Sequence, residues 1–181
     1  MISTIPAIKK VLLYSILIFC LVLVICYCIG LRINVTPSIA LGLYVTVDQP
    51  IAKGDYVEFC PPIKEPFITA QRRGYIAYGL CPGRLGKLMK KVVGVQEDQV
   101  SITSEGVNVN NTYVPYSQLR IADAYGRLLP KLYPQQFQLQ PSELFLMSDT
   151  TDTSFDSRYF GVIRTASVLN VVRPLFTWST P

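Results

Sequence analysis

The sequence contains no histidine among its 181 residues. This absence excludes the Ser-His-Asp triad, the Cys-His pair and every metal site built on histidine. Any hydrolase made from this chain has to take its general base from a carboxylate, a lysine with a lowered pKa or an N-terminal amine. Long basic runs are also absent, although the net charge is +5. We therefore expect a mildly basic surface beside anionic lipid and no nucleic-acid partner.

The sequence contains five cysteines. Cys20, Cys26 and Cys28 lie inside a hydrophobic block, where a thiol behaves as a small apolar group. Cys60 and Cys81 lie in the polar part and belong to no CxxC pair or four-ligand zinc spacing. We therefore expect no metal and no cofactor. In an oxidising compartment these two cysteines would form a disulfide, and the alternative is two separate buried thiols.

The hydrophobic block predicts a membrane anchor at residues 11–30, twenty positions without a charge. A helix rises about 1.5 Å per residue, so this stretch spans roughly the 30 Å of a hydrocarbon core. Lys9 and Lys10 precede it directly, whereas only Arg32 follows it closely. This charge bias indicates that the short N-terminal end stays in the cytoplasm.

The chain thus divides into a cytoplasmic N-terminus (1–10), the anchor and a domain (31–181) on the far side of the membrane. A cleaved signal peptide is the alternative reading of the apolar run. The run is longer than the core of such a peptide, and no A-x-A-like cleavage site follows it. We therefore expect the anchor to be retained, with membrane lipid as its surroundings.

Beyond the anchor, short segments are punctuated by Gly, Pro, Asn and Asp, and several alternate as strands do. We expect strands at 43–47, 55–59, 89–95, 99–103, 106–114, 143–147, 158–163 and 166–172. A tight turn is expected at Asn110–Asn111, a helix around 66–77 and a surface loop over 130–141. This pattern predicts a mainly β, antiparallel domain behind an N-terminal transmembrane helix.

Four stretches carry the motifs of the chain: NVTPSIALGLY (34–44), KGDYV (53–57), LMKKVVG (88–94) and SDTTDTSFDSRYFG (148–161). Together they resemble the type I signal peptidase family, and most closely its conjugative-transfer branch, the TraF-type pilin-maturation peptidases. The resemblance covers the anchor and nearly all of the remaining chain. It implies a signal-peptidase-like antiparallel β domain.

In this family the serine at the place of Ser38 is the nucleophile. Thr36 matches a hydroxyl that helps to hold the oxyanion, beside the backbone N–H of Ser38. A nucleophile tethered just beyond the bilayer can reach a scissile bond in the same layer. Without the resemblance, Pro37-Ser38 is an ordinary loop dipeptide.

The resemblance assigns the general base to Lys90, the lysine four residues before Gly94. Adjacent strand residues point to opposite faces, so only one of Lys90 and Lys91 can face inward. Apolar neighbours on both sides would desolvate the inward lysine and favour its neutral amine. The alternative is a pair of surface lysines on an edge strand.

The fourth stretch matches the family segment Ser-x-Asp-Ser-Arg-x-x-Gly with identical spacing. By this resemblance Ser154 orients the lysine amine, Asp156 and Arg158 form an ion pair that supports the site, and Asp149 adds further support. The alternative is an acidic turn with a capping role.

The resemblance implies a Ser/Lys endopeptidase in a bacterial inner membrane, with its catalytic domain on the periplasmic side. It would remove a leader or tail from a translocated precursor, a pilin in this branch, and some members also join the new ends into a ring. Other conjugation or type IV secretion components are expected partners, and the segments around Cys60 and Cys81 look like this branch. A catalytically idle, anchored scaffold of such a complex is the alternative function.

Overall fold

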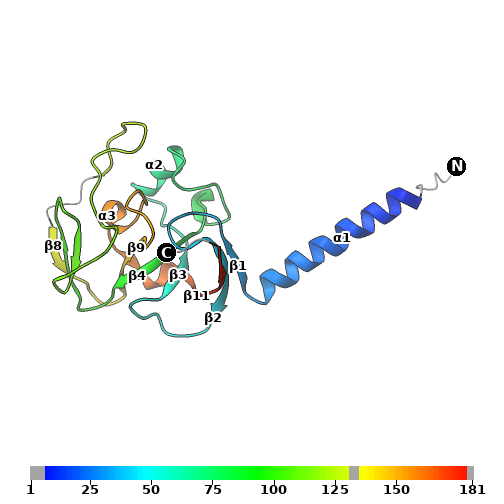
Figure 1. The fold of residues 1–181 in the computed structure, drawn as a ribbon, viewed down its shortest axis with the longest axis horizontal. Coiled ribbons are helices and arrows are strands. Elements are labelled where there is room, and N and C mark those ends of the chain that lie inside the picture. Colours follow the sequence, from blue (N-terminus) through cyan, green and yellow to red (C-terminus); the bar gives the residue numbers. More distant parts are fainter. Residues whose placement is uncertain (1–6, 131–134, 179–181) are drawn as a thin grey trace.

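The computed structural model of the protein describes residues 7–130 and 135–178. Residues 1–6 of the expected cytoplasmic N-terminus and residues 131–134 of the expected surface loop lie outside the described residues. The described part consists of one long helix followed by a body made mainly of strands (Figure 1).

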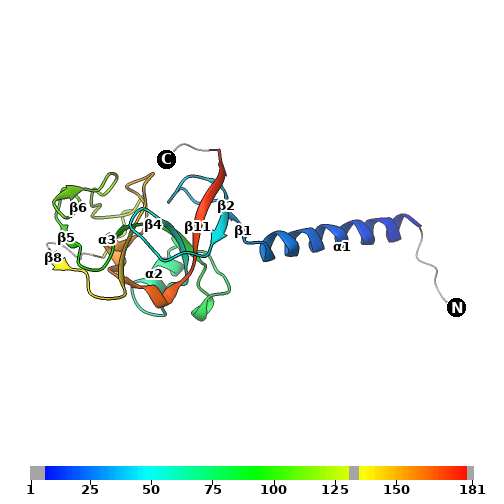
Figure 2. The ribbon, with the colours of Figure 1, turned by 90° about the horizontal axis from the view of Figure 1, so that it is seen from below.

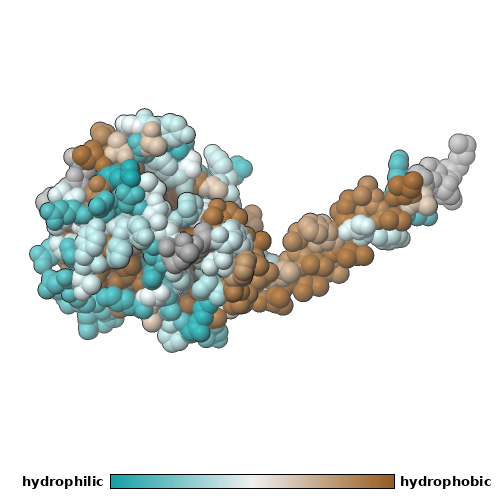
Figure 3. Space-filling view, viewed as in Figure 1, coloured by the Kyte–Doolittle hydropathy of each residue, from teal (hydrophilic) through white to brown (hydrophobic). Residues whose placement is uncertain are grey.

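The helix α1 (Ala7–Cys28) contains no proline and no carboxylate, and its side chains are predominantly aliphatic. It begins four residues before the predicted anchor and ends two residues earlier. None of its residues is buried, and its surface is hydrophobic over most of its length (Figure 3). Within the described residues it is the one helix long and apolar enough to cross a membrane. An apolar helix left outside the protein core fits a membrane anchor.

The helix ends at Cys28 and is followed two residues later by Gly30, whose φ of +88° is in the region that favours glycine. A Cβ at this position would collide with the side chain of Thr46. The chain then turns directly into the first strand, β1 (Leu31–Asn34). Only Ile29 and Gly30 therefore separate the helix from the sheet.

The larger sheet described by the structure has seven strands in the order β1-β2-β11-β3-β4-β9-β10. The further strands are β2 (Gly42–Val47), β3 (Tyr56–Phe59), β4 (Leu88–Gly94), β9 (Glu143–Met147), β10 (Ile163–Arg164) and β11 (Val168–Thr177). A smaller sheet, β7-β6-β5-β8, contains β5 (Gln99–Ile102), β6 (Val107–Val109), β7 (Thr112–Tyr113) and β8 (Gln135–Gln138). The strand pairs are antiparallel, which confirms the predicted fold class.

The strand β11 lies inside the larger sheet, between β2 and β3, although it comes last in sequence among the described strands. Figure 2 shows this strand running alongside β2, close to the start of the body at β1. The pairing of β3 with β4 sets Val57 opposite Lys90. The core beneath this sheet is rich in aromatic rings, and Phe67 of α2 (Phe67–Arg72) packs 4.8 Å from Phe160 between centroids.

The predicted strand at 158–163 is wrong at every position except the last, Ile163. Residues Ser157–Phe160 form a short helix, α3, all of whose residues are buried, and only β10 follows as a strand. The Asp156 carboxylate accepts a hydrogen bond from the backbone N–H of Arg158 and caps this helix. A local cap and burial from all sides therefore override the apolar run that favoured a strand.

Two smaller differences concern loops and helices. The expected loop at 130–141 contains β8, which pairs with β5 in the smaller sheet. The expected helix at 66–77 shortens to α2, which ends before Gly74 with φ +80°. The tight turn is confirmed, because Asn110 and Asn111 have φ of 50° and 62° between β6 and β7.

Candidate active site

Lys90 and Lys91 point to opposite faces of β4, as strand geometry requires. Lys90 is buried, with 2% of its surface exposed. The side chain of Lys91 is 35% exposed and lies 3.2 Å from a carboxylate oxygen of Asp149. The structure thus places one lysine in the interior and pairs the other at the surface.

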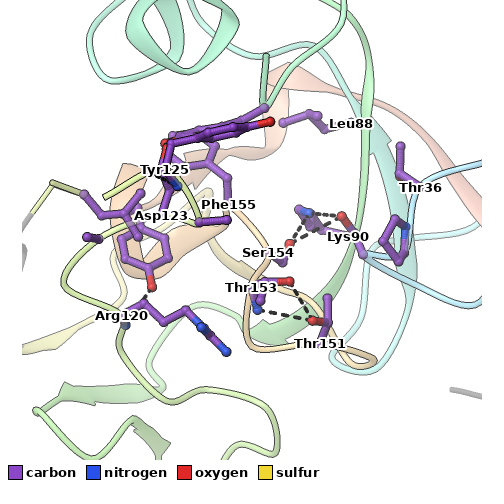
Figure 4. Close-up of a pocket in the computed structure, with 17 residues that line it drawn as sticks. Thr36, Leu88, Lys90, Arg120, Asp123, Tyr125, Thr151, Thr153, Ser154 and Phe155 are labelled. Atoms are coloured by element: carbon purple, nitrogen blue, oxygen red, sulfur yellow. Dashed lines mark hydrogen bonds between the residues drawn. The ribbon is translucent and has the colours of Figure 1, made fainter. Parts of the chain in front are cut away.

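The amine of Lys90 lies between two serine hydroxyls. Lys90 Nζ donates to Ser38 Oγ at 2.5 Å and to Ser154 Oγ at 2.7 Å. Ser154 Oγ in turn donates to Ser38 Oγ at 3.3 Å. Figure 4 shows the Lys90 amine and the Ser154 hydroxyl side by side at one end of a pocket. Three residues separated by 52 and 64 positions in the sequence thus form one compact polar group.

Burial changes the proton affinity of this amine. Desolvation lowers the pKa of Lys90 from 10.5 to about 8, the nearby Asp156 raises it, and Arg158 lowers it further. A substantial fraction of the amine is therefore neutral near pH 8. A neutral amine within hydrogen-bond distance of a hydroxyl can accept the hydroxyl proton.

The loop that carries Ser38 is held by Asn34, a residue that sequence reasoning did not single out. Its side chain is buried and its Nδ2 donates to the carbonyl oxygens of Thr36 (2.8 Å), Ile39 (3.0 Å) and Ala40 (3.1 Å). An asparagine at a strand end gives no sequence signal for this role, because its bonds depend on how the following loop folds back.

Thr36 lies in the pocket beside Ser38, but its hydroxyl already has an acceptor. Thr36 Oγ1 donates to Asn34 Oδ1 at 3.0 Å, and the Thr36 backbone N–H donates to the same oxygen at 3.2 Å. The hydroxyl would have to turn away from Asn34 before it could donate to an oxyanion.

Asp156 and Arg158 form a buried ion pair with two short bonds. Arg158 Nε and Nη2 each lie 2.7 Å from an Asp156 carboxylate oxygen, and neither side chain is exposed. Arg158 also donates to the carbonyl oxygens of Ser154 and Gln118. The pair thereby fixes the backbone that carries Ser154.

The structure does not bring Asp149 together with Ser38 and Lys90. Asp149 Oδ2 accepts from the Tyr56 hydroxyl at 2.6 Å and from Lys91 on the other face of β4. Burial, and then the bond to Asp149, raise the pKa of Tyr56. Asp149 therefore supports the strand that carries Lys90 from behind.

The pocket above Ser38 and Lys90 has a volume of about 400 Å³, and a segment that sequence reasoning did not assign to the site forms one wall. Figure 4 places Arg120, Asp123 and Tyr125 on the side of the pocket opposite Thr36. The wall is fixed by Asp123, which accepts from Tyr75 Oη and from Arg127 Nε. Desolvation raises the pKa of Asp123, but the hydrogen bonds from Tyr75 and Arg127 outweigh it and hold this pKa below its ordinary value.

In the structure a disulfide joins Cys60 and Cys81, which lie 21 positions apart in the sequence. The bridge closes the segment that contains α2, and Cys81 is buried in the main core. Since Phe67 and Ala70 of α2 belong to the same core, the bridge ties both ends of this segment to the larger sheet.

With this geometry established, comparison with known proteins identifies the family. A family model described as signal peptidase, peptidase S26, matches residues 4–178. The chain belongs to the signal peptidase family. This confirms the resemblance drawn from the four motifs, and membership implies a serine endopeptidase.

Two relatives place this signal peptidase family member more closely. It is 46% identical over 152 residues to a plasmid transfer protein TraF of Escherichia coli, covering 84% of this chain and 86% of the relative. It is 38% identical over 152 residues to a probable conjugal transfer protein TraF of Sinorhizobium fredii, covering 83% and 79%. A crystal structure of a signal peptidase I from Enterococcus faecalis covers 68% of this chain and 97% of that one, with 18% identity and a TM-score of 0.37.

Proposed function

We propose that this chain is a membrane-anchored endopeptidase in which Ser38 is the nucleophile and Lys90 is the general base. The observation that carries the proposal is a serine hydroxyl 2.5 Å from a buried lysine amine at the end of a pocket. The lowered pKa of Lys90, about 8, supports it because the amine can be neutral at a working pH.

The reaction needs the same amine to accept and then donate a proton twice, once as the ester forms and once as it is hydrolysed. Ser38 Oγ attacks the scissile carbonyl carbon and its proton passes to the neutral Nζ of Lys90. The ammonium then gives this proton to the leaving amine as the C–N bond breaks, which leaves an ester on Ser38. A water molecule, deprotonated by Lys90, hydrolyses the ester and restores both groups.

The neighbouring residues have positioning roles in this proposal. Ser154 orients the amine through its 2.7 Å contact, and the Asp156–Arg158 pair holds the backbone of Ser154. The backbone N–H of Ser38 and, after rotation, the hydroxyl of Thr36 would stabilise the oxyanion.

The names of the relatives point to conjugation as the setting. We infer that the substrate is a translocated precursor, most simply a pilin-like protein, cut after a small residue to remove a leader or tail. Ring closure follows from the same ester if the precursor's own N-terminal amine attacks it in place of water. Other components of the conjugation or type IV secretion machinery are the proposed partners.

The proposed placement is a single pass through a bacterial inner membrane. Residues 1–10 would lie in the cytoplasm, residues 11–30 in the lipid and residues 31–181, the peptidase domain, in the periplasm. The basic pair Lys9–Lys10 at the start of α1 supports this orientation.

The decisive experiment is co-expression with a candidate pilin precursor from the same conjugation system. Ser38→Ala and Lys90→Met should abolish maturation, and Lys90→Arg should do so as well because a guanidinium stays protonated. Lys91→Met is the matched control, since its side chain faces the opposite side of β4. Maturation at the wild-type rate by Ser38→Ala would refute the proposal and favour the idle scaffold.

A further inference from the structure

Glu58 is a buried carboxylate that the proposed reaction does not use. It lies on β3 with 3% of its surface exposed. Its carboxylate oxygens lie 3.4 Å from Arg32 Nε, 3.2 Å from Lys87 Nζ and 2.8 Å from Asn170 Nδ2. A buried carboxylate with two cationic partners holds both of them in place, because releasing either would leave its charge less compensated.

The two cations held by Glu58 both contact Tyr27, in the last turn of α1. The Arg32 guanidinium lies 4.1 Å from the centre of the Tyr27 ring, and its Nη1 donates to the Tyr27 carbonyl oxygen at 3.0 Å. Lys87 Nζ donates to the Tyr27 hydroxyl at 3.3 Å and lies 5.4 Å from the same ring centre. The ring is thus held by two cation–π contacts and by a hydrogen bond at its hydroxyl, and the Tyr27 backbone is held by a hydrogen bond at its carbonyl oxygen.

These contacts join the helix to the body at a narrow junction. Figures 1 and 2 show α1 extending away from the strands in both views, with the body meeting it only at one end. The covalent link consists of Ile29 and Gly30, and a glycine permits many directions. Backbone hydrogen bonds hold Gly30 itself, since its N–H donates to the Tyr27 carbonyl oxygen at 3.1 Å and its carbonyl oxygen accepts from the Thr46 N–H at 2.9 Å. The side-chain contacts of Tyr27 add to these bonds in holding the direction of the helix.

The elements that hold Tyr27 also hold the reacting groups. Arg32 lies on β1, whose last residue Asn34 fixes the Ser38 loop. Lys87 immediately precedes β4, which carries Lys90. The strand β3, which carries Glu58, pairs directly with β4. A displacement of the helix is thus opposed by the same strands that position the nucleophile and the base.

We propose that Tyr27, Arg32, Glu58 and Lys87, the junction cluster, fix the anchor helix on the domain and so set the height of Ser38 above the bilayer. A precursor whose own apolar segment lies in the same membrane would then be cut at a set distance from that segment. This control of the cleavage position rests on the proposed peptidase function, whereas the fixed orientation of the helix does not.

The activity test uses a designed single-span precursor with identical small-residue cleavage sites repeated at increasing distances from its apolar segment. Full-length protein in liposomes should cut mainly at one site, identified by mass spectrometry of the products. Tyr27→Ala should spread cleavage over several sites and slow cleavage of the membrane-bound precursor about tenfold. Tyr27→Phe, which keeps the ring under Arg32, should retain the wild-type site.

A merely structural role is excluded by a second substrate and a matched variant. A short soluble peptide with the same site, offered to the same proteins in detergent, should be cut by Tyr27→Ala within about twofold of wild type. Tyr14→Ala removes an exposed tyrosine from the middle of the same helix and should leave the site distribution unchanged. Equal losses on both substrates, or an unchanged site distribution in Tyr27→Ala, would overturn the proposal.

The orientation itself can be measured without any activity. One spin label is placed on Cys20, with Cys26 and Cys28 replaced by alanine, and a second is placed on the exposed position 104 after Ser104→Cys. Glu58→Gln and Tyr27→Ala should broaden the distance distribution between the labels in nanodiscs. If the distance distribution of these two variants is as narrow as that of wild type, the junction cluster does not fix the helix. This conclusion would hold whether or not Ser38 proves to be the nucleophile.

Discussion

The pKa of Lys90 gives a prediction about rate that can be worked out from the structure. Desolvation lowers this pKa from 10.5 to about 8, so about one tenth of the amine is neutral at pH 7 and about nine tenths at pH 9. Only the neutral amine can accept the Ser38 proton. We therefore expect kcat/KM for a soluble peptide to rise about tenfold per pH unit below pH 7 and to level off above pH 9.

The same shift predicts that the stability of the protein rises with pH. A lysine whose pKa is raised by a surface salt bridge would have the opposite effect. In the window between pH 8 and 10.5 the unfolded chain still binds the lysine proton, while the folded chain has released it. The free energy of unfolding therefore rises with pH in this window. A shift of this size corresponds to about 3 kcal/mol. At pH 7 folding carries the full free-energy cost of burying this amine. The amine must either stay charged in the interior or release a proton that the unfolded chain would keep.

The assay compares wild type with Lys90→Met by urea unfolding in detergent at pH 7 and pH 10. The variant removes the buried amine, so the stability of wild type relative to the variant should improve by up to about 3 kcal/mol between the two pH values. Lys91→Met, with a partly exposed side chain, serves as the control and should follow wild type. A flat rate profile between pH 6 and 8, or no change in the stability difference, would refute a desolvated base.

Three further outcomes follow from the contacts around the site. Ser154→Ala removes the hydroxyl 2.7 Å from the amine and should lower kcat for the peptide about 100-fold, and steady-state kinetics with an unchanged kcat would contradict the role of Ser154. Asp123→Asn weakens the hydrogen bonds that fix the pocket wall, so it should raise KM more than it lowers kcat, and an effect on kcat alone would contradict this role for the wall. Replacing Cys60 and Cys81 by alanine opens a closed loop and should cost about 3 kcal/mol in urea unfolding, and an unchanged midpoint would show that the bridge contributes no stability.

Local pattern was sufficient wherever the signal lay within a few neighbouring residues. A charge-free run of twenty residues predicted the helix that becomes α1, and an apolar segment at 143–147 matched β9 at both ends. The two asparagines at 110 and 111 marked their turn because few other residues tolerate positive φ. Alternation along β4 also predicted that one of its two adjacent lysines would face inward.

Local pattern failed where distant segments decide what is buried. The run at 158–163 has the composition of a strand, but Asp156 caps a buried helix there. The loop at 130–141 contains β8 because β5, more than 30 positions earlier, offers a free edge. No short-range rule places β11 between β2 and β3.

The candidate site shows the same contrast between what short stretches of sequence predict and what contacts between distant residues decide. The resemblance of short motifs to the signal peptidase family was enough to nominate Ser38, Lys90 and Ser154, because the order of residues along a strand or loop is local. Tertiary structure alone decided that these three meet, that Asp149 lies behind β4, and that Glu58 holds the cations around Tyr27. The physical reason is that hydrogen bonds and burial join side chains by their separation in space, and the folding of the sheet brings together residues that the sequence keeps 26 to 116 positions apart.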